Sequence, residues 1–303
     1  MGSHGIKAEV KGLLQVLPPV DFCFLYGSAL HPNNHDKSKA IDFILGVSKP
    51  LEWHTQITGV ADRIGVGVHF NPYVNWSDKM FKYGVVRLHD LINDILDWER
   101  FYLSGRLQKP VHILVDTLNL EDVNSVNLRA TVSASLLLLP TKFSEEDLYA
   151  KICSLSYTGD LRMLFAEDRD KVKKIVRGQF DIFHSMYKPF LEEYKAKELL
   201  RSSSSSNHQG NIISQDCSLS AAYALVSSLP QTIRSQIAMK LGGGNVHELA
   251  ISSREEAAKC MQKILKRKVM VSSARQAVSG LLAVGAVNGM RYLARKMRKA
   301  WKS

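Results

Sequence analysis

Cysteine is scarce in this chain of 303 residues, and its cysteines form no metal or disulfide motif. The four of them, Cys23, Cys153, Cys217 and Cys260, are widely spaced and make no CxxC pair. A zinc site or a disulfide framework is therefore not expected, and a reducing compartment fits this usage better.

Long apolar runs are also lacking. The most apolar stretches, SLLLLP and GLLAVGAV, are far shorter than the roughly 20 residues that cross a bilayer. The opening residues, MGSHGIKAEVKGLLQVL, contain neither a signal-peptide core nor a transit peptide rich in Arg and Ser. No membrane span or targeting segment is predicted from these stretches.

Acidic residues are outnumbered by basic ones. The 29 Asp and Glu residues stand against 40 Lys and Arg residues, which gives a net charge of +11. This excess favours an anionic partner: a nucleotide, a nucleic acid or an acidic membrane.

The most informative stretch is VDFCFLYGSALHPNNHDKSKAIDFILGV, residues 20 to 47. It reads as a strand, a Gly-Ser turn, a polar loop and a second strand that carries Asp42. Gly27 permits a tight turn and close approach of a ligand, and Ser28 offers a hydroxyl and an N–H to a phosphate oxygen. A carboxylate within an apolar strand is costly unless it is paired or binds a metal. Gly-Ser turns are nevertheless common, and an Asp at a strand edge is often simply solvated.

Cations and a second carboxylate accompany the next two strands. Lys82 leads a short strand over residues 82–86, and Arg106 and Lys109 flank the entry to the strand that ends in Asp116. Asp116 is either a further metal ligand on a neighbouring strand or a turn-forming Asp at a strand end.

The remaining chain is predicted to be mostly helical. Ser144 and Asp147 have capping-box spacing, and the serine-rich segment that begins at Ser202 is typical of a flexible loop. Residues 65–73 are expected to form an irregular strand or loop. Helices are expected at residues 6–17, after Pro50, and at 88–103 (closing at Ser104-Gly105), 118–139, 170–200, 219–229, 230–241 and from Ser253 onward.

The C-terminal tail has the pattern of a basic amphipathic helix. Apolar residues recur in steps of three and four from Leu282 to Met297 and Trp301, beside a stripe of Arg291, Arg295 and Arg298. This pattern indicates a helix that lies in an anionic membrane interface. A core-packing helix with a solvated cationic face is the alternative.

Several longer motifs together resemble one family. A Gly-Ser turn followed by an acidic strand resembles the nucleotidyltransferase (polymerase-beta-like) superfamily. The motifs FLYGSALHP, AIDFILGV, KPLEWH, GVGVHFN, KYGVV, YLSGRLQKPV, LPTKFSEEDL and LSYTGDLRML, in this order over roughly residues 20 to 200, are similar to those of the mitochondrial phosphatidate cytidylyltransferases, also called translocator assembly and maintenance proteins.

The resemblance implies that CTP and phosphatidic acid react to give CDP-diacylglycerol and pyrophosphate, with Mg²⁺. It also implies a peripheral location on the matrix side of the inner mitochondrial membrane, in the pathway to phosphatidylglycerol and cardiolipin. On this assignment Tyr26, Gly27, Ser28, Lys82, Arg106 and Lys109 bind the nucleotide, Asp42 and Lys109 are catalytic, and Asp42 and Asp116 bind the metal.

One departure from the superfamily pattern concerns the metal site. The superfamily has two carboxylates two positions apart on the strand, but Ala40 and Ile44 flank Asp42 here. The second ligand must come from elsewhere, with Asp116, Asp36 and Asp160 as candidates.

The predicted fold is α/β, with a mixed sheet flanked by helices. The expected divisions are a nucleotidyltransferase domain at residues 1–139, a helical, winged-helix-like region at 140–200, a flexible loop at 201–215, and helices with the membrane-binding tail at 216–303. Two other functions remain open: a nucleotidyltransferase acting on RNA or protein, and a non-catalytic assembly factor on the inner membrane. Nucleic acid is not expected as a partner, because the basic residues do not interleave with aromatic ones.

Overall fold

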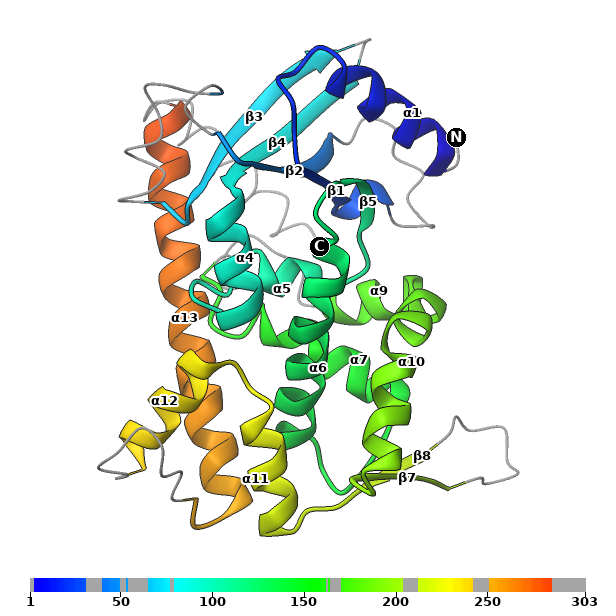
Figure 1. Cartoon of the computed structure of the whole chain (residues 1–303), viewed down its shortest axis with the longest axis vertical. Helices are drawn as coiled ribbons and strands as arrows, with labels where there is room; N and C mark the ends of the chain where they lie inside the picture. The colour runs from blue at the N-terminus through cyan, green and yellow to red at the C-terminus, as the bar shows by residue number, and fades with distance from the viewer. Residues whose placement is uncertain are drawn as a thin grey trace.

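The computed structural model describes residues 3–30, 40–49, 53, 65–76, 79–161, 163, 170–203, 212–241 and 251–284. Within these residues a mixed sheet lies at one end of the molecule and most of the helices lie below it (Figure 1). The mixed α/β fold predicted from the sequence is therefore confirmed.

The larger sheet has five strands among the described residues. In spatial order they are β3 (Val68–Trp76), β4 (Lys79–Arg87), β2 (Ile41–Val47), β1 (Phe22–Tyr26) and β5 (His112–Asp116). Strands β2 and β4 are parallel, and the other neighbouring pairs are antiparallel. The strand–turn–strand prediction for residues 20–47 is confirmed. The segment expected to be an irregular strand or loop contributes to β3, whose pairing with β4 is irregular between Asn71 and Val74.

Both faces of this sheet contribute side chains to buried clusters, because successive side chains of a strand point to opposite faces. Phe43 and Leu45 of β2 belong to the same buried cluster as Val10 of helix α1 (Ser3–Leu14). Ile44 points to the opposite face, where it shares a cluster with Leu91 of helix α4 (Leu88–Asp97). Asp42 has the same parity as Ile44 and therefore lies on the α4 face.

Helix α4 is shorter than the sequence predicts. It ends at Trp98, whose φ of 52° is left-handed, and not at Ser104-Gly105. Ser104 instead begins the short helix α5 (Ser104–Leu107). The apolar periodicity continues through residues 98–103, but the backbone there turns.

The second half of the molecule is built around α6 (Leu120–Leu138), which packs against α4 and against three helices of this half, α7, α11 and α13. Its other elements are the strands β6 (Lys142–Ser144), β7 (Leu200–Ser203) and β8 (Ile212–Gln215), and the helices α7 (Glu145–Leu155), α9 (Lys171–Gly178), α10 (Phe180–Ala196), α11 (Leu219–Ser227), α12 (Gln231–Lys240) and α13 (Arg254–Val284). The 3-10 helix η1 (Ser28–Leu30) follows β1 and belongs to the sheet region.

Two expectations for this half can be compared directly. The capping box is confirmed, because Ser144 Oγ accepts a hydrogen bond from the Asp147 N–H and the Asp147 carboxylate accepts one from the Ser144 N–H. The predicted loop over 201–215 is partly strand, since both of its ends pair in the smaller sheet, which has the order β6-β8-β7.

Helix α13 runs beside the other helices and reaches the sheet (Figure 1). Within the residues that the structure describes, no helix is both long and apolar enough to cross a membrane. Most of the helix predicted after Pro50, and the tail residues Arg291, Arg295, Met297, Arg298 and Trp301, lie outside the described residues.

Candidate active site

The Gly-Ser turn lies directly against the carboxylate of β2. Tyr26 and Asp42 are register partners on β1 and β2. Gly27 follows with φ of 92°, and a Cβ built on it would lie 3.0 Å from Asp42 Oδ2. Both Gly27 and Ser28 are exposed, so the turn presents its backbone to solvent beside a half-buried carboxylate.

Lys82 brings a cation to the same part of the sheet. It is the register partner of Asp42 on the parallel strand β4. Paired residues on neighbouring strands point to the same face, with Cβ atoms about 5 Å apart. Tyr26, Asp42 and Lys82 therefore form a row across three strands on the face that carries α4 and α5.

The loop after α4 is held by one buried carboxylate, Asp94, which is only 3% exposed. Its oxygens accept hydrogen bonds from the backbone N–H groups of five consecutive residues, 100 to 104, at 2.7–3.0 Å. Such charge-assisted bonds are about twice as strong as neutral ones. They fix the loop in spite of the left-handed residues Trp98 and Phe101, and they set the start of α5.

Arg106, on α5, is held between two aromatic rings. Its Cζ lies 4.2 Å from the ring centre of Tyr26 and 4.8 Å from that of Tyr102, and Nη2 donates a 2.8 Å hydrogen bond to the Tyr102 hydroxyl. Burial lowers the pKa of Arg106, but coupling to Tyr102 and Tyr26 outweighs this effect and leaves the pKa raised. The guanidinium is therefore a permanent positive charge beside the row on the sheet.

Arg106 also retains hydrogen-bonding capacity. Its buried Nε has no hydrogen-bond partner among the described residues. A buried unsatisfied donor costs about 1–3 kcal/mol. An anionic ligand that accepted this hydrogen bond would remove that cost.

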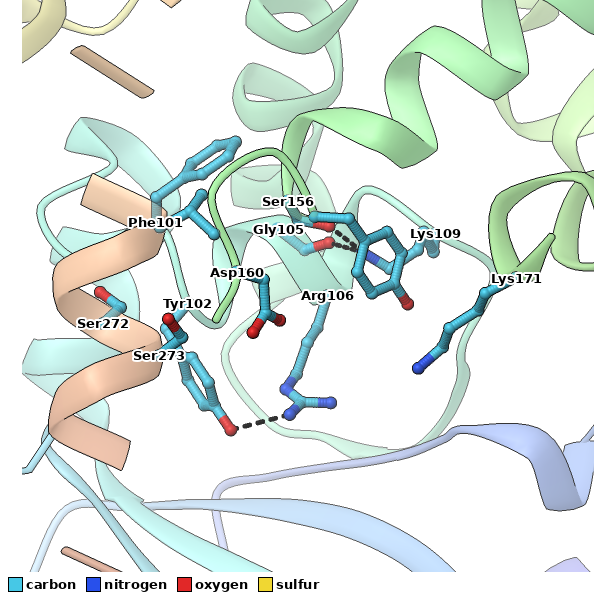
Figure 2. A pocket seen from close by; sticks show the side chains of 12 residues that line it. Phe101, Tyr102, Gly105, Arg106, Lys109, Ser156, Asp160, Lys171, Ser272 and Ser273 are labelled. Atoms are coloured by element: carbon cyan, nitrogen blue, oxygen red, sulfur yellow. Dashed lines mark hydrogen bonds between the residues drawn. The ribbon is translucent and has the colours of Figure 1, made fainter. Parts of the chain in front are cut away.

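Lys109 stands next to Arg106 in a pocket (Figure 2). Its Nζ donates to the Gly105 carbonyl and, at 2.6 Å, to Ser156 Oγ, and it lies 5.2 Å from the ring centre of Tyr157. Lys171, at the start of α9, places its Nζ 5.1 Å from the same ring. Two ammonium groups thus lie close to one ring.

The pocket encloses about 100 Å³ and is lined by four separate parts of the chain. Its walls come from α5 with the residues on either side of it, from the loop after α7, from Lys171 at the start of α9, and from α13. Asp160 is 3% exposed, and Figure 2 shows its carboxylate directed into the pocket near Tyr102 and Arg106. Three cations, two tyrosines and one carboxylate therefore surround one small space.

Asp116 lies away from this site. It pairs with Phe22 at one end of β1, whereas Asp42 pairs with Tyr26 at the other end. Four strand positions correspond to about 13 Å. The structure therefore does not bring Asp116 and Asp42 together to share one metal ion.

The Asp116 carboxylate has a different use. Its oxygens accept backbone N–H groups of Leu118, Leu120 and Glu121, at the start of α6. A carboxylate there caps the helix and interacts favourably with its dipole. Asp36, another candidate ligand, lies outside the described residues. Among the described residues, no group of three or more His, Cys, Asp or Glu side chains could hold a metal ion.

Several residues of the site were missed from the sequence. Asp94, Lys171, Ser272 and Ser273 belong to none of the motifs, and Tyr157 lies in LSYTGDLRML but was assigned no role. No sequence pattern marked Asp94, because the apolar periodicity continues past it. The others are brought to the pocket by tertiary packing.

The site of this α/β protein is chemically suited to bind phosphate groups, because cations, an exposed Gly-Ser backbone and a strand carboxylate lie on one face of a sheet. A family model described as phosphatidate cytidylyltransferase, mitochondrial, matches residues 10–57 and 55–299. The chain belongs to this family, which confirms the resemblance stated above.

Curated relatives agree over nearly the whole chain. Proteins named phosphatidate cytidylyltransferase, mitochondrial, are 33% identical in Danio rerio, over 94% of this chain and 92% of the relative, and 32% identical in Mus musculus, over 100% and 98%. The protein of that name from Caenorhabditis elegans is 27% identical over 97% of this chain and 99% of its own length.

Proposed function

We propose that this protein is a CTP:phosphatidate cytidylyltransferase. It transfers the cytidylyl group of CTP to phosphatidate, giving CDP-diacylglycerol and pyrophosphate. The observation that carries the proposal is the arrangement on one sheet face: the Gly27 backbone against Asp42, with Arg106 stacked on Tyr26 beside them. The family relationship supplies the substrates.

The residues divide the work by charge. The exposed turn at Gly27 and Ser28 offers N–H and hydroxyl donors to the triphosphate, beside the rings of Tyr26 and Tyr102. Lys82, Arg106 and Lys109 neutralise phosphate oxygens. Phosphatidate is an anionic nucleophile already, so the reaction needs in-line positioning and charge stabilisation more than a general base. Lys109, fixed by Gly105 and Ser156, is suited to hold a phosphate oxygen at a set place.

Asp42 is the proposed magnesium ligand. Mg²⁺ in nucleotide sites commonly has one or two carboxylates together with substrate phosphates, so a single strand carboxylate beside the triphosphate turn fits it. When bound, Mg²⁺ would neutralise charge on the triphosphate. Asp116 is left out of this proposal because its oxygens cap α6.

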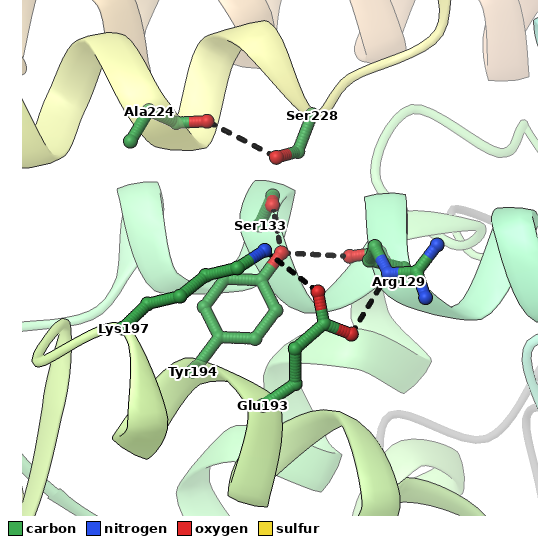
Figure 3. A network of polar contacts seen from close by, with 7 residues as sticks. All are labelled: Arg129, Ser133, Glu193, Tyr194, Lys197, Ala224 and Ser228. Atoms are coloured by element: carbon green, nitrogen blue, oxygen red, sulfur yellow. Dashed lines mark hydrogen bonds and ion pairs between the residues drawn. The ribbon is translucent and has the colours of Figure 1, made fainter.

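The fold is assigned here as a nucleotidyltransferase core followed by a winged-helix-like region. The sheet with its Gly-Ser turn is taken as a nucleotidyltransferase core. The region that follows contains helix α6, strand β6, helices α7, α9 and α10, and hairpin β7–β8, and this mixture of helices with a small sheet supports its assignment as winged-helix-like. Glu193 and Tyr194 of α10 bind Arg129 and Ser133 of α6, which holds these two helices of the region together (Figure 3).

The proposal also includes a place of action. The relatives are named mitochondrial, and the basic amphipathic pattern of the tail favours an anionic membrane. We place the protein at the matrix side of the inner mitochondrial membrane as a peripheral enzyme, feeding phosphatidylglycerol and cardiolipin synthesis.

The test is transfer of radiolabel from CTP into lipid by the purified full chain. Vesicles containing phosphatidate should be labelled in the presence of Mg²⁺, whereas phosphatidylcholine vesicles should not, and ATP, GTP and UTP should not replace CTP. Deletion of residues 285–303 should reduce both vesicle binding and labelling. A folded protein that binds the vesicles but labels no lipid would contradict the enzymatic function.

A further inference from the structure

Helix α13 forms one wall of the pocket, although it lies far from the other walls in sequence. Val269, Ser272 and Ser273 line the pocket from this helix. The two serine residues are buried, at 5% and 4% exposure. Figure 2 shows both of them on the helix turn that faces Tyr102 and Asp160.

Ser272 binds the wall that carries Tyr102 and Arg106. Its Oγ donates to the carbonyl oxygen of Arg100, in the loop whose N–H groups Asp94 holds. One turn earlier, Lys268 Nζ donates to the carbonyl oxygen of Glu99 at 3.0 Å. This loop is thus held by Asp94 at its N–H groups and by α13 at its carbonyl groups.

Ser273 binds the opposite wall. Its Oγ accepts the N–H of Leu161 at 3.2 Å and donates to the Met270 carbonyl of its own helix at 3.0 Å. Gly159, with φ of 91°, lies so close to α13 that an added Cβ would be 2.6 Å from the Lys266 carbonyl oxygen. The loop bearing Tyr157 and Asp160 therefore rests on the helix backbone.

The apolar anchorage of α13 is separate from these polar contacts. Met261, Ile264, Leu265 and Val269 are buried in the large cluster that includes α6. Loss of a serine hydroxyl should leave the helix seated on this cluster and release only the loop to which that hydroxyl is bonded.

We propose that Ser272 and Ser273 are positioning residues for the phosphate pocket: adjacent residues of one helix turn hold its two loops at a fixed separation. Arg106 and Asp160 are thereby kept at the distance that the ligand requires. This inference rests on the proposed function, in that the pocket receives a phosphate group of a substrate.

The test compares single variants of the full chain. Ser272→Ala and Ser273→Ala each remove one bond to one loop, Gly159→Ala displaces the second loop with both serines intact, and Ser279→Ala is the matched control on the same helix, outside the pocket. Each variant is assayed for KM and kcat with CTP and phosphatidate vesicles, for thermal unfolding, and for amide hydrogen exchange.

Each pocket variant should raise KM for CTP or phosphatidate about fivefold or more, the equivalent of one net hydrogen bond. Ser272→Ala should accelerate exchange only at residues 98–104, and Ser273→Ala and Gly159→Ala only at 157–161. Ser279→Ala should change none of these quantities. The inference would be overturned if the wild-type chain is active and the pocket variants keep the wild-type KM. It would also be overturned if their amide exchange is faster evenly over the whole chain. An inactive wild-type chain would instead refute the proposed function. Amide exchange at residues 98–104 and 157–161 would then still test whether Ser272 and Ser273 hold the two loops.

Discussion

Gly27 should not tolerate a side chain, for two reasons: its backbone conformation and its close approach to Asp42. Its φ of 92° lies in a region where an L-residue such as Ala is strained by roughly 1–2 kcal/mol. The added Cβ would also stand 3.0 Å from Asp42 Oδ2, inside the 3.4 Å at which ordinary contact begins. The Asp42 carboxylate would have to move by about 0.4 Å.

Gly27→Ala should therefore lower stability by about 1–2 kcal/mol and lower kcat/KM for CTP by about tenfold. A misplacement of 1 Å can cost ~100-fold, so a shift of less than half that size predicts a smaller loss. Urea denaturation gives the first quantity, and lipid labelling from CTP gives the second.

Gly12→Ala is the matched control for this prediction. Gly12 lies within α1, and a Cβ there would meet nothing within 4 Å. Ala is the better helix former, so this variant should gain up to about 1 kcal/mol and keep its activity. Gly27→Ala with wild-type stability and kcat/KM would refute the reasoning about the turn.

Three other changes test separate parts of the structure. Asp94→Asn would replace one accepting oxygen with an amide NH2 donor, which would face the backbone N–H groups that Asp94 binds. Urea denaturation should therefore show a free energy of unfolding lower by about 3 kcal/mol, and an unchanged midpoint would contradict the role of this carboxylate. Arg106→Lys should keep the charge but lose the stacking on Tyr26 and Tyr102, lowering kcat/KM about 30-fold with little change in Tm; equal activity would contradict it. Lys197 and Arg129 hold the pKa of Glu193 below its ordinary 4.5, so its contribution to stability is present above that pH and is lost as the pH falls through the lower folded pKa. Glu193→Gln should therefore flatten the fall of Tm with acid in this range, and an unchanged slope would contradict the ion pairs.

Local patterns were sufficient for much of the fold and for the centre of the site. Residues 20–47 were readable because apolar alternation, a Gly-Ser turn and one carboxylate all lie within a single stretch. The Ser144 capping box was readable for the same reason. Arg106 and Lys109 belong to one short motif and do lie together.

Tertiary geometry decided the remainder. Asp116 could not be separated from Asp42 without the register, since both are strand carboxylates and only their pairing with opposite ends of β1 keeps them apart. The end of α4 at Trp98 depends on the Asp94 carboxylate collecting five N–H groups, which apolar periodicity does not encode. Ser272 and Ser273 reach the pocket only through the packing of α13.

The most direct test of the account is CTP-dependent lipid labelling by Asp42→Asn compared with Asp116→Asn, each normalised to folded protein. Asp42→Asn should lower the rate by about two to three orders of magnitude, the usual effect of removing one group that stabilises the transition state. Asp116→Asn should be less stable, having lost a helix cap, but should keep its rate per folded molecule. An active Asp42→Asn variant, or an Asp116→Asn variant that is folded and inactive, would contradict the assignment of Asp42, and not Asp116, to the active site.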